Sequence, residues 1–87
     1  MTYGQSFDAY LRYYLGNAVL AQGDADSANT QFEASLREFR AVGDDLPCGV
    51  VLGSLGLLAA RRGEHDQARA RFAECLPLLR RGGDQWT

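Results

Sequence analysis

The chain carries few side chains that could act as nucleophiles or bind a metal: two cysteines, Cys48 and Cys75, and one histidine, His65. Cys48 falls in the first turn of an expected helix, where the helix dipole favours a thiolate. No histidine neighbours it in a catalytic arrangement, so it is not predicted to be a nucleophile. A single imidazole without cysteines at ligand spacing does not predict a metal site. We expect Cys75 in the core and His65 in a surface turn.

The acidic residues and the glycines do not form a recognisable catalytic motif. The carboxylates are spread over expected turns and exposed faces, most of them as helix caps. The segment Gly53-Ser54-Leu55-Gly56 lies within an expected helix and lacks the lysine of a phosphate-binding loop. The sequence therefore predicts a protein that is not an enzyme and holds no metal or cofactor.

Composition describes one small globular domain over residues 1–87. The chain is 46% hydrophobic and 23% charged, which is ordinary for a folded protein. Residues 1–60 hold three Arg against seven acids, a balance of −4, whereas residues 61–81 hold six Arg against three acids, a balance of +3. All basic residues are arginine, a bias that favours a GC-rich bacterial genome. The absence of a signal peptide or a long apolar run predicts a cytoplasmic protein without a membrane span.

The elements that position these residues repeat along the chain with a period of 40 residues. The identical pairs are Leu15 and Leu55, Gly16 and Gly56, Gly23 and Gly63, Asp26 and Asp66, Ala28 and Ala68, Phe32 and Phe72, Leu36 and Leu76, Arg40 and Arg80, Gly43 and Gly83, and Asp44 and Asp84. A fixed period in this range is typical of stacked structural repeats. We expect repeat 1 over about residues 6–43, repeat 2 over about 46–83, and the start of a third repeat at 84–87.

Apolar residues at i, i+3 and i+4 predict two helices in each repeat, joined by turns too short for anything but an antiparallel hairpin. The first pair is expected to begin at an N-cap on Ser6, after a frayed lead-in at 1–5, and to turn at Gly23. Asp26 is expected to cap the second helix, and Gly43 to end it.

The second pair begins at Asp44-Asp45-Leu46-Pro47 and turns at Gly63, with Asp66 as the cap of its second helix. Pro77 is expected to kink or shorten that helix, and Gly82-Gly83 to end it. The fold class predicted is all-α, with two antiparallel helix hairpins.

These residues resemble the tetratricopeptide repeat, whose pattern places Leu-Gly in the first helix of a hairpin and Ala and Phe in the second. The resemblance covers about residues 6–87 and implies a right-handed solenoid. Small residues such as Gly16 and Ala28 would let two helices approach closely, and Phe32 and Phe72 would fill the seam between hairpins. The matching signature is Leu15, Gly16, Gly23, Ala28, Phe32, Leu55, Gly56, Gly63, Ala68 and Phe72.

The chain also departs from the common pattern of that family. Arg12 and Leu52 stand where Trp is usual, Arg40 and Arg80 where Pro is usual, and the period is 40 rather than 34. This long form, with Gly-Asp turns and Arg-rich helices, resembles arrays in large bacterial transcriptional activators of the LuxR-type and antibiotic-regulatory classes.

The resemblance implies a concave groove, lined by the first helix of each hairpin, that receives a peptide or a partner helix. Carried over by position, the partner-binding residues are Tyr10, Tyr13, Tyr14, Asn17, Val50, Ser54, Leu57 and Arg61. Tyr10 and Tyr14 have a second interpretation, packing against a neighbouring repeat. Asn17 matches the asparagine of the carboxylate-clamp subclass, but Tyr13 replaces its lysine, so a clamp for a chain terminus is not predicted.

Two hairpins are fewer than the three repeats that such arrays normally need. Leu76, Leu78 and Leu79 are expected to leave an apolar face open. Either the chain is a fragment of a longer array, or its ends associate between copies, as a symmetric dimer or by exchange of a hairpin.

The function predicted is protein–protein interaction, as a piece of a bacterial regulator. Alternatives that the sequence leaves open are a regulatory domain that senses a peptide or small ligand, and a stand-alone self-associating adaptor. Direct nucleic-acid binding is disfavoured because the expected groove is rich in Tyr and has only Arg61 as a cation.

Overall fold

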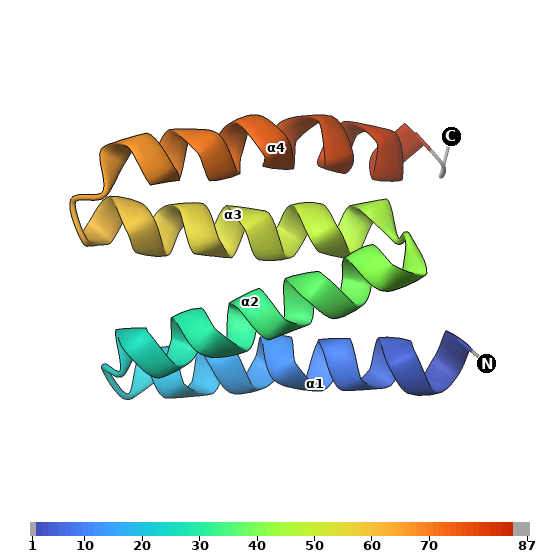
Figure 1. The fold of residues 1–87 in the computed structure, drawn as a ribbon, viewed down its shortest axis with the longest axis horizontal. Helices are drawn as coiled ribbons and strands as arrows, with labels where there is room; N and C mark the ends of the chain where they lie inside the picture. Colours follow the sequence, from blue (N-terminus) through green and yellow to red (C-terminus); the bar gives the residue numbers. More distant parts are fainter. Residues whose placement is uncertain (1, 85–87) are drawn as a thin grey trace. The chain divides into compact units, whose positions relative to one another are not determined.

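The computed structural model describes residues 2–84, with the side chains of residues 7–83, and its chain forms four helices (Figure 1). They are α1 (Thr2–Ala21), α2 (Ala25–Val42), α3 (Asp45–Arg61) and α4 (His65–Asp84). Helix α1 packs along α2, and α3 packs along α4. The two hairpins coincide with two compact units, Met1–Gly43 and Asp44–Thr87. The prediction of an all-α chain built from two helix hairpins is confirmed.

The turns inside the two hairpins close in the same way. The amide of Gly23 donates to Leu20 O at 2.9 Å and that of Asp24 to Val19 O at 3.0 Å. Forty residues later, the amide of Gly63 donates to Ala60 O at 3.1 Å and that of Glu64 to Ala59 O at 2.9 Å. Gly23 and Gly63 have φ of 89° and 77°, a left-handed conformation that glycine adopts without steric cost. Both glycines end their helices as predicted.

Three predicted helix starts are wrong by two to five residues. Helix α1 begins at Thr2, so Ser6 lies inside it and residues 2–5 are helical instead of frayed. Asp24, not Asp26, is the N-cap of α2: its Oδ1 accepts from the Ser27 amide at 3.0 Å and its Oδ2 from the Ser27 hydroxyl at 2.6 Å. Helix α4 begins at His65, which places Asp66 in its first turn and not at its cap.

The C-terminal half of α4 also differs from the prediction. The helix runs through Pro77 and through Gly82-Gly83 to Asp84. Pro77 removes one backbone donor, but Pro77 and Ala73 are both exposed, so water can satisfy the carbonyl that loses its partner. Gly82 serves packing instead of termination, because a Cβ there would lie 2.7 Å from the Cβ of Leu46 and 2.9 Å from its Cα. Residues 85–87 of the expected third repeat lie outside the described part of the chain.

In each hairpin an aromatic ring of the second helix packs directly on a glycine of the first helix. A Cβ on Gly16 would lie 2.6 Å from Cε1 of Phe32, and one on Gly56 would lie 2.7 Å from Cε1 of Phe72. Each ring therefore contacts the first helix of its own hairpin, and the role predicted for the two rings between hairpins stays a prediction. Ala28 is fully buried, so small residues do line the packed face of α2.

Polar and sulfur groups complete the two cores at a repeat-related position. In the first hairpin the buried Ser35 hydroxyl donates to the carbonyl oxygen of Ala9 at 2.8 Å. Its counterpart 40 residues on is Cys75, which is 4% exposed and whose Sγ lies 3.6 Å from where a Cβ on Gly53 would stand. Burial raises the pKa of the Cys75 thiol. The predicted core position of Cys75 is confirmed.

Candidate partner-binding surface

Tyr10, Tyr13 and Tyr14 of α1 form an aromatic row that packs against the core of the first hairpin. The ring of Tyr10 meets the buried ring of Phe39 edge-on, with centroids 4.9 Å apart and an interplanar angle of 78°. The Tyr13 ring lies 5.8 Å from that of Phe32 and 5.6 Å from that of Tyr14. Such ring pairs fix side-chain orientation and add stability beyond area burial. The row therefore has a defined shape before any partner arrives.

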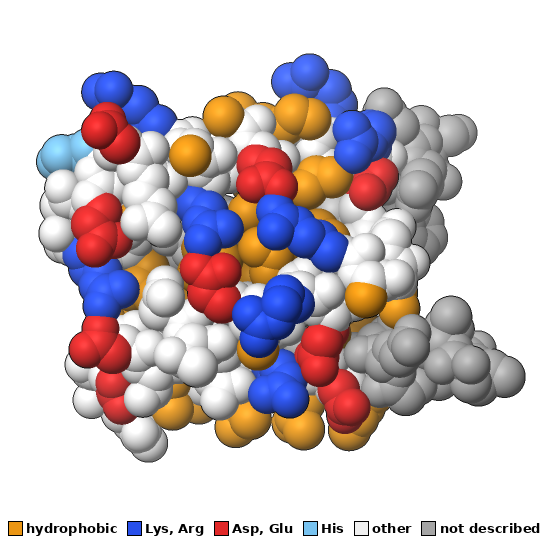
Figure 2. Space-filling model, in the orientation of Figure 1, with side chains coloured by type: hydrophobic (Ala, Val, Ile, Leu, Met, Phe, Trp, Pro, Cys, Tyr) orange, Lys and Arg blue, Asp and Glu red, His pale blue; other side chains and the backbone are white. Residues whose placement is uncertain are grey.

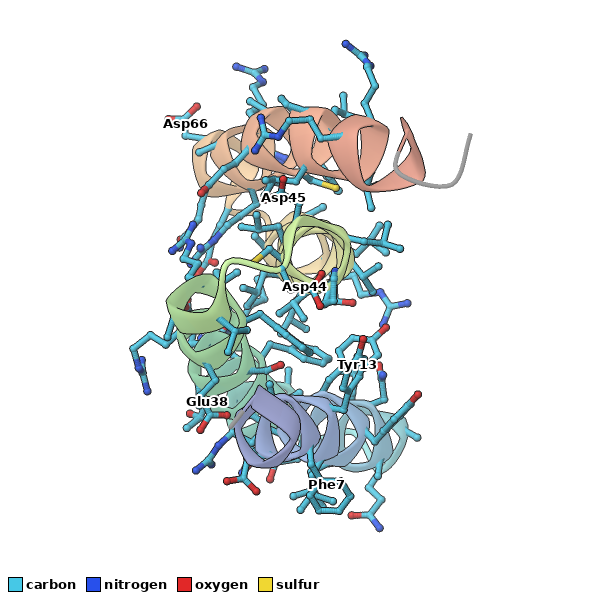
Figure 3. All side chains as sticks on the ribbon, turned by 90° about the vertical axis from the view of Figure 1, so that its right-hand side faces the viewer. Phe7, Tyr13, Glu38, Asp44, Asp45 and Asp66 are labelled. Atoms are coloured by element: carbon cyan, nitrogen blue, oxygen red, sulfur yellow. The ribbon has the colours of Figure 1, made fainter. Side chains whose placement is uncertain are left out.

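The three tyrosines of this row differ in solvent exposure. Tyr13 is half-buried between its two ring neighbours, Tyr10 is 42% exposed and Tyr14 is 63% exposed. Asn17, one turn further along α1, is also exposed. In Figure 3, Tyr13 and Phe7 leave α1 on opposite sides, and Phe7 points away from α2. Tyr13 thus lies on the side of α1 opposite Phe7, whereas Tyr14, two helical turns from Phe7, lies on the same side of the helix as Phe7.

An ion pair crosses between the two helices of the first hairpin. Arg12 Nε and Glu38 Oε1 lie 3.1 Å apart, joining α1 to α2 across the hairpin. Their side chains are 44% and 33% exposed, so solvent weakens the interaction and its contribution is small, on the order of 0.5 kcal/mol. Arg12 occupies the position where the common repeat has Trp. Its role here is to bridge the two helices.

The predicted residues of the second hairpin follow one face of α3, at i, i+4, i+7 and i+11. Val50 is 40% exposed and Leu57 is 59% exposed, while Arg61 is also exposed. Ser54 is half-buried, and its hydroxyl donates to Val50 O at 3.3 Å, within its own helix. This face is apolar at two exposed positions and cationic at its C-terminal end. The sequence pattern did not show that Ser54 differs from the other three residues of this face, although its hydroxyl is already hydrogen-bonded to Val50 O.

The hairpin that carries this face has an ion pair of its own. Arg81 Nε lies 3.1 Å from Asp45 Oδ2 and so links the end of α4 to the start of α3. The repeat pattern did not predict this contact, because Arg81 and Asp45 have no counterparts at the related positions Ala41 and Gln5.

Cys48 and His65 lie near the starts of two different helices, α3 and α4. Cys48 is 4% exposed and lies in the first turn of α3, as predicted, with its amide donating to Asp44 O at 3.3 Å. His65 is exposed at the start of α4. Among the described residues, no group of three or more His, Cys, Asp or Glu side chains could hold a metal ion. No helix in that part of the chain is long and apolar enough to span a membrane.

Charged side chains are mixed in sign over both hairpins. Figure 2 shows red and blue groups interspersed on the visible face, without a large patch of one sign. It also shows hydrophobic groups over α1 at the bottom of the view and over α4 at the top.

Comparison with known families agrees with the fold and the repeat pattern. The family model described as tetratricopeptide repeat matches residues 7–81, which is most of the chain. The chain therefore belongs to the tetratricopeptide repeat family, a class of all-α repeat that typically mediates protein–protein interaction and is usually non-catalytic. No curated protein and no solved structure is significantly similar to it.

Proposed function

We propose that this chain binds a peptide or a partner helix in a concave groove lined by the first helix of each hairpin. Tyr10, Tyr13, Tyr14 and Asn17 would line it from α1, and Val50, Ser54, Leu57 and Arg61 from α3. The observation that carries the proposal is the aromatic row of α1, whose exposed rings are held against the buried Phe32 and Phe39. Side chains that are oriented before binding lose little entropy when a partner docks.

The chemistry of these residues indicates the kind of segment that would fit. Tyrosine offers a broad apolar surface with a hydroxyl at its tip, and it is enriched where proteins recognise one another. Val50 and Leu57 add exposed aliphatic surface, and Arg61 adds a cation at the end of the α3 face. A segment with apolar or aromatic anchors and an acidic group toward one end matches this set.

Peptide selection followed by titration tests the proposal. Peptides selected on the immobilised chain would be titrated by fluorescence anisotropy against Tyr14→Ala and Leu57→Ala, two exposed positions on α1 and α3. Each variant should weaken binding by about tenfold, because an anchor side chain contributes on the order of 1–2 kcal/mol. Arg37→Ala, an exposed change on α2, is the matched control and should bind like wild type. Equal affinity of all four proteins for every selected peptide would refute the groove.

We further propose that the chain acts within a bacterial transcriptional regulator, in the cytoplasm. The support is in the sequence: the 40-residue period, the Gly-Asp turn and the exclusive use of arginine as the basic residue. The test is the reading frame that encodes this chain. A DNA-binding or nucleotide-binding domain in the same frame would support the regulator, and a flanking domain of another class would refute it.

A second copy of the chain is a further candidate partner. Leu76 is 58% exposed, while Leu78 and Leu79 are half-buried, so α4 presents part of the apolar face expected there. Self-association through this face is tested by measuring the mass of the chain across a range of concentrations.

A further inference from the structure

Some residues related by the 40-residue repeat differ sharply in exposure. In one pair the member in the first hairpin is the exposed one, and in the other pair it is the member in the second hairpin. Leu15 on α1 is 44% exposed, whereas its counterpart Leu55 on α3 is 2% exposed. Leu36 on α2 is 1% exposed, whereas its counterpart Leu76 on α4 is 58% exposed. A repeat buries such positions against a neighbouring repeat. The open positions therefore lie on the first helix of one hairpin and on the second helix of the other.

The open surface of α1 is a continuous apolar stripe, here called the α1 face. Phe7, Leu11 and Leu15 recur every four residues and are 65%, 46% and 44% exposed. Ala9 and Gly16 are buried on the other side of the helix, where α2 packs. The related positions of α3 that fall within its core, Val51 and Leu55, are 1% and 2% exposed. A surface of this composition is normally covered in repeat proteins.

The open surface of α4 is smaller and is bordered by cations; it is here called the α4 face. Leu76 is its exposed centre, and Phe72 and Leu79 lie beside it, half-buried. The related residues of α2, Phe32 and Phe39, are 0% and 1% exposed. The apolar side chains of the α4 face are therefore more exposed than their counterparts on α2.

Charge favours contact between the α1 face and the α4 face over contact of either face with its own copy. Asp8 is exposed next to Phe7 on the α1 face, and Arg80 is exposed one turn from Leu76 on the α4 face. Pairing each face with its own copy would not bring Asp8 and Arg80, which carry opposite charges, into one interface. Pairing the α1 face with the α4 face brings opposite charges together. The net charge is −4 over residues 1–60 and +3 over residues 61–81, which also favours contact between the two different faces.

We propose that copies of this chain associate head to tail, with the α4 face of one copy docked on the α1 face of the next. The inference rests on the self-association proposed above and assigns its two surfaces and its polarity. It does not involve the α3 residues of the peptide groove. A head-to-tail contact leaves one face free at each end of a pair, so association continues beyond the dimer unless a ring closes.

Complementation between two blocked variants tests the polarity. Leu11→Arg places a cation on the α1 face, opposite Arg80, and Leu76→Glu places an anion on the α4 face, opposite Asp8. Each variant alone should show at least about a tenfold weaker association than wild type in sedimentation velocity. An equimolar mixture should form heterodimers where each variant alone does not, because the pair retains one intact α1 face and one intact α4 face.

Leu57→Glu is the matched control, since Leu57 is as exposed as Leu76 but lies on the groove side of α3. It should associate like wild type even if it abolishes peptide binding, which separates the two proposals. If Leu11→Arg does not fold by circular dichroism, Asp8→Arg tests the same face from an exposed polar position.

Two results would overturn the inference. A wild-type chain that stays monomeric at hundreds of micromolar would refute self-association altogether. Either blocked variant that still dimerises like wild type, or a mixture that forms no heterodimer, would refute the head-to-tail arrangement and favour a symmetric contact.

Discussion

The ring of Phe32 rests on Gly16 so closely that a single methyl group on that glycine would lie 2.6 Å from Cε1 and 2.8 Å from Cδ1 of the ring. Phe32 has no exposed surface, so the ring has little room to move away. The same relationship joins Phe72 to Gly56 in the second hairpin. This contact sets how near the two helices of a hairpin can lie.

The first prediction concerns this glycine. Gly16→Ala should lower the free energy of unfolding by about 1–3 kcal/mol, because overpacking outweighs the gain in helix propensity. Urea denaturation followed by circular dichroism measures the change. Gly53→Ala is the control: its methyl would stand 3.6 Å from Cys75 Sγ, an ordinary contact, so that variant should be as stable as wild type or more so. A Gly16→Ala protein at least as stable as Gly53→Ala would contradict the packing described.

A second prediction concerns the buried hydroxyl between α1 and α2. Ser35→Ala removes the hydrogen bond to the carbonyl oxygen of Ala9 and should cost about 1 kcal/mol of unfolding free energy. Ser54→Ala removes a hydroxyl that bonds only within its own helix and should change stability by less than about 0.5 kcal/mol. The two midpoints of thermal unfolding, compared under identical conditions, would be indistinguishable if the Ser35 bond contributed nothing.

The cap of α2 should respond to acid. The Ser27 hydroxyl and then the Ser27 amide lower the pKa of Asp24 below its usual value of 3.8. Because the folded pKa is the lower one, the stabilisation by this cap is complete above pH 3.8 and is lost as pH falls through the folded pKa. Asp24→Ala should therefore unfold at lower temperature than wild type at pH 7, and the difference should shrink at the lowest pH at which both proteins still fold.

Asp44 offers a matched comparison for that cap. It is the N-cap residue of α3 but makes no side-chain capping hydrogen bond. Asp44→Ala should shift the unfolding temperature less than Asp24→Ala. Equal effects of the two substitutions would mean that the Ser27 contacts do not stabilise α2.

The thiol of Cys75 should be slow to react in the folded protein. Burial raises its pKa, so little thiolate is present at pH 8, and the side chain is only 4% exposed. In a Cys48→Ala background, alkylation by iodoacetamide followed by mass spectrometry should be at least about tenfold slower in buffer than in 8 M urea. Similar rates in both solvents would show that α4 opens readily from α3.

The sequence alone predicted the helices and their pairing because apolar spacing, short turns and a fixed period are local signals. Gly23, Gly43 and Gly63 marked three helix ends correctly, since positive φ is a local requirement that few other residues meet. The starts were less accurate because several acids stand in each turn. Asp24 and Asp26 are both suitable caps by type, and only the Ser27 contacts show which one caps the helix.

Contacts across a hairpin could not be predicted in the same way. Gly82 allows Leu46 to approach closely, and this contact depends on how α4 packs against α3. Residue spacing in the sequence does not predict that tertiary relationship. The same limit applies to the aromatic row, whose members were identified by position, whereas the support from Phe32 and Phe39 emerged only from the packed hairpin. Exposure is also a tertiary property: Leu15 and Leu55 are identical in type but opposite in burial.

The matching hydrogen bonds at Gly23-Asp24 and Gly63-Glu64 have an evolutionary consequence. A gene segment of 40 codons that begins and ends at related positions encodes one complete hairpin with its own turn. Unequal crossing-over between two such segments would add or delete whole hairpins without creating a new loop. Lineages carrying this gene are therefore expected to vary in repeat number more readily than in repeat length.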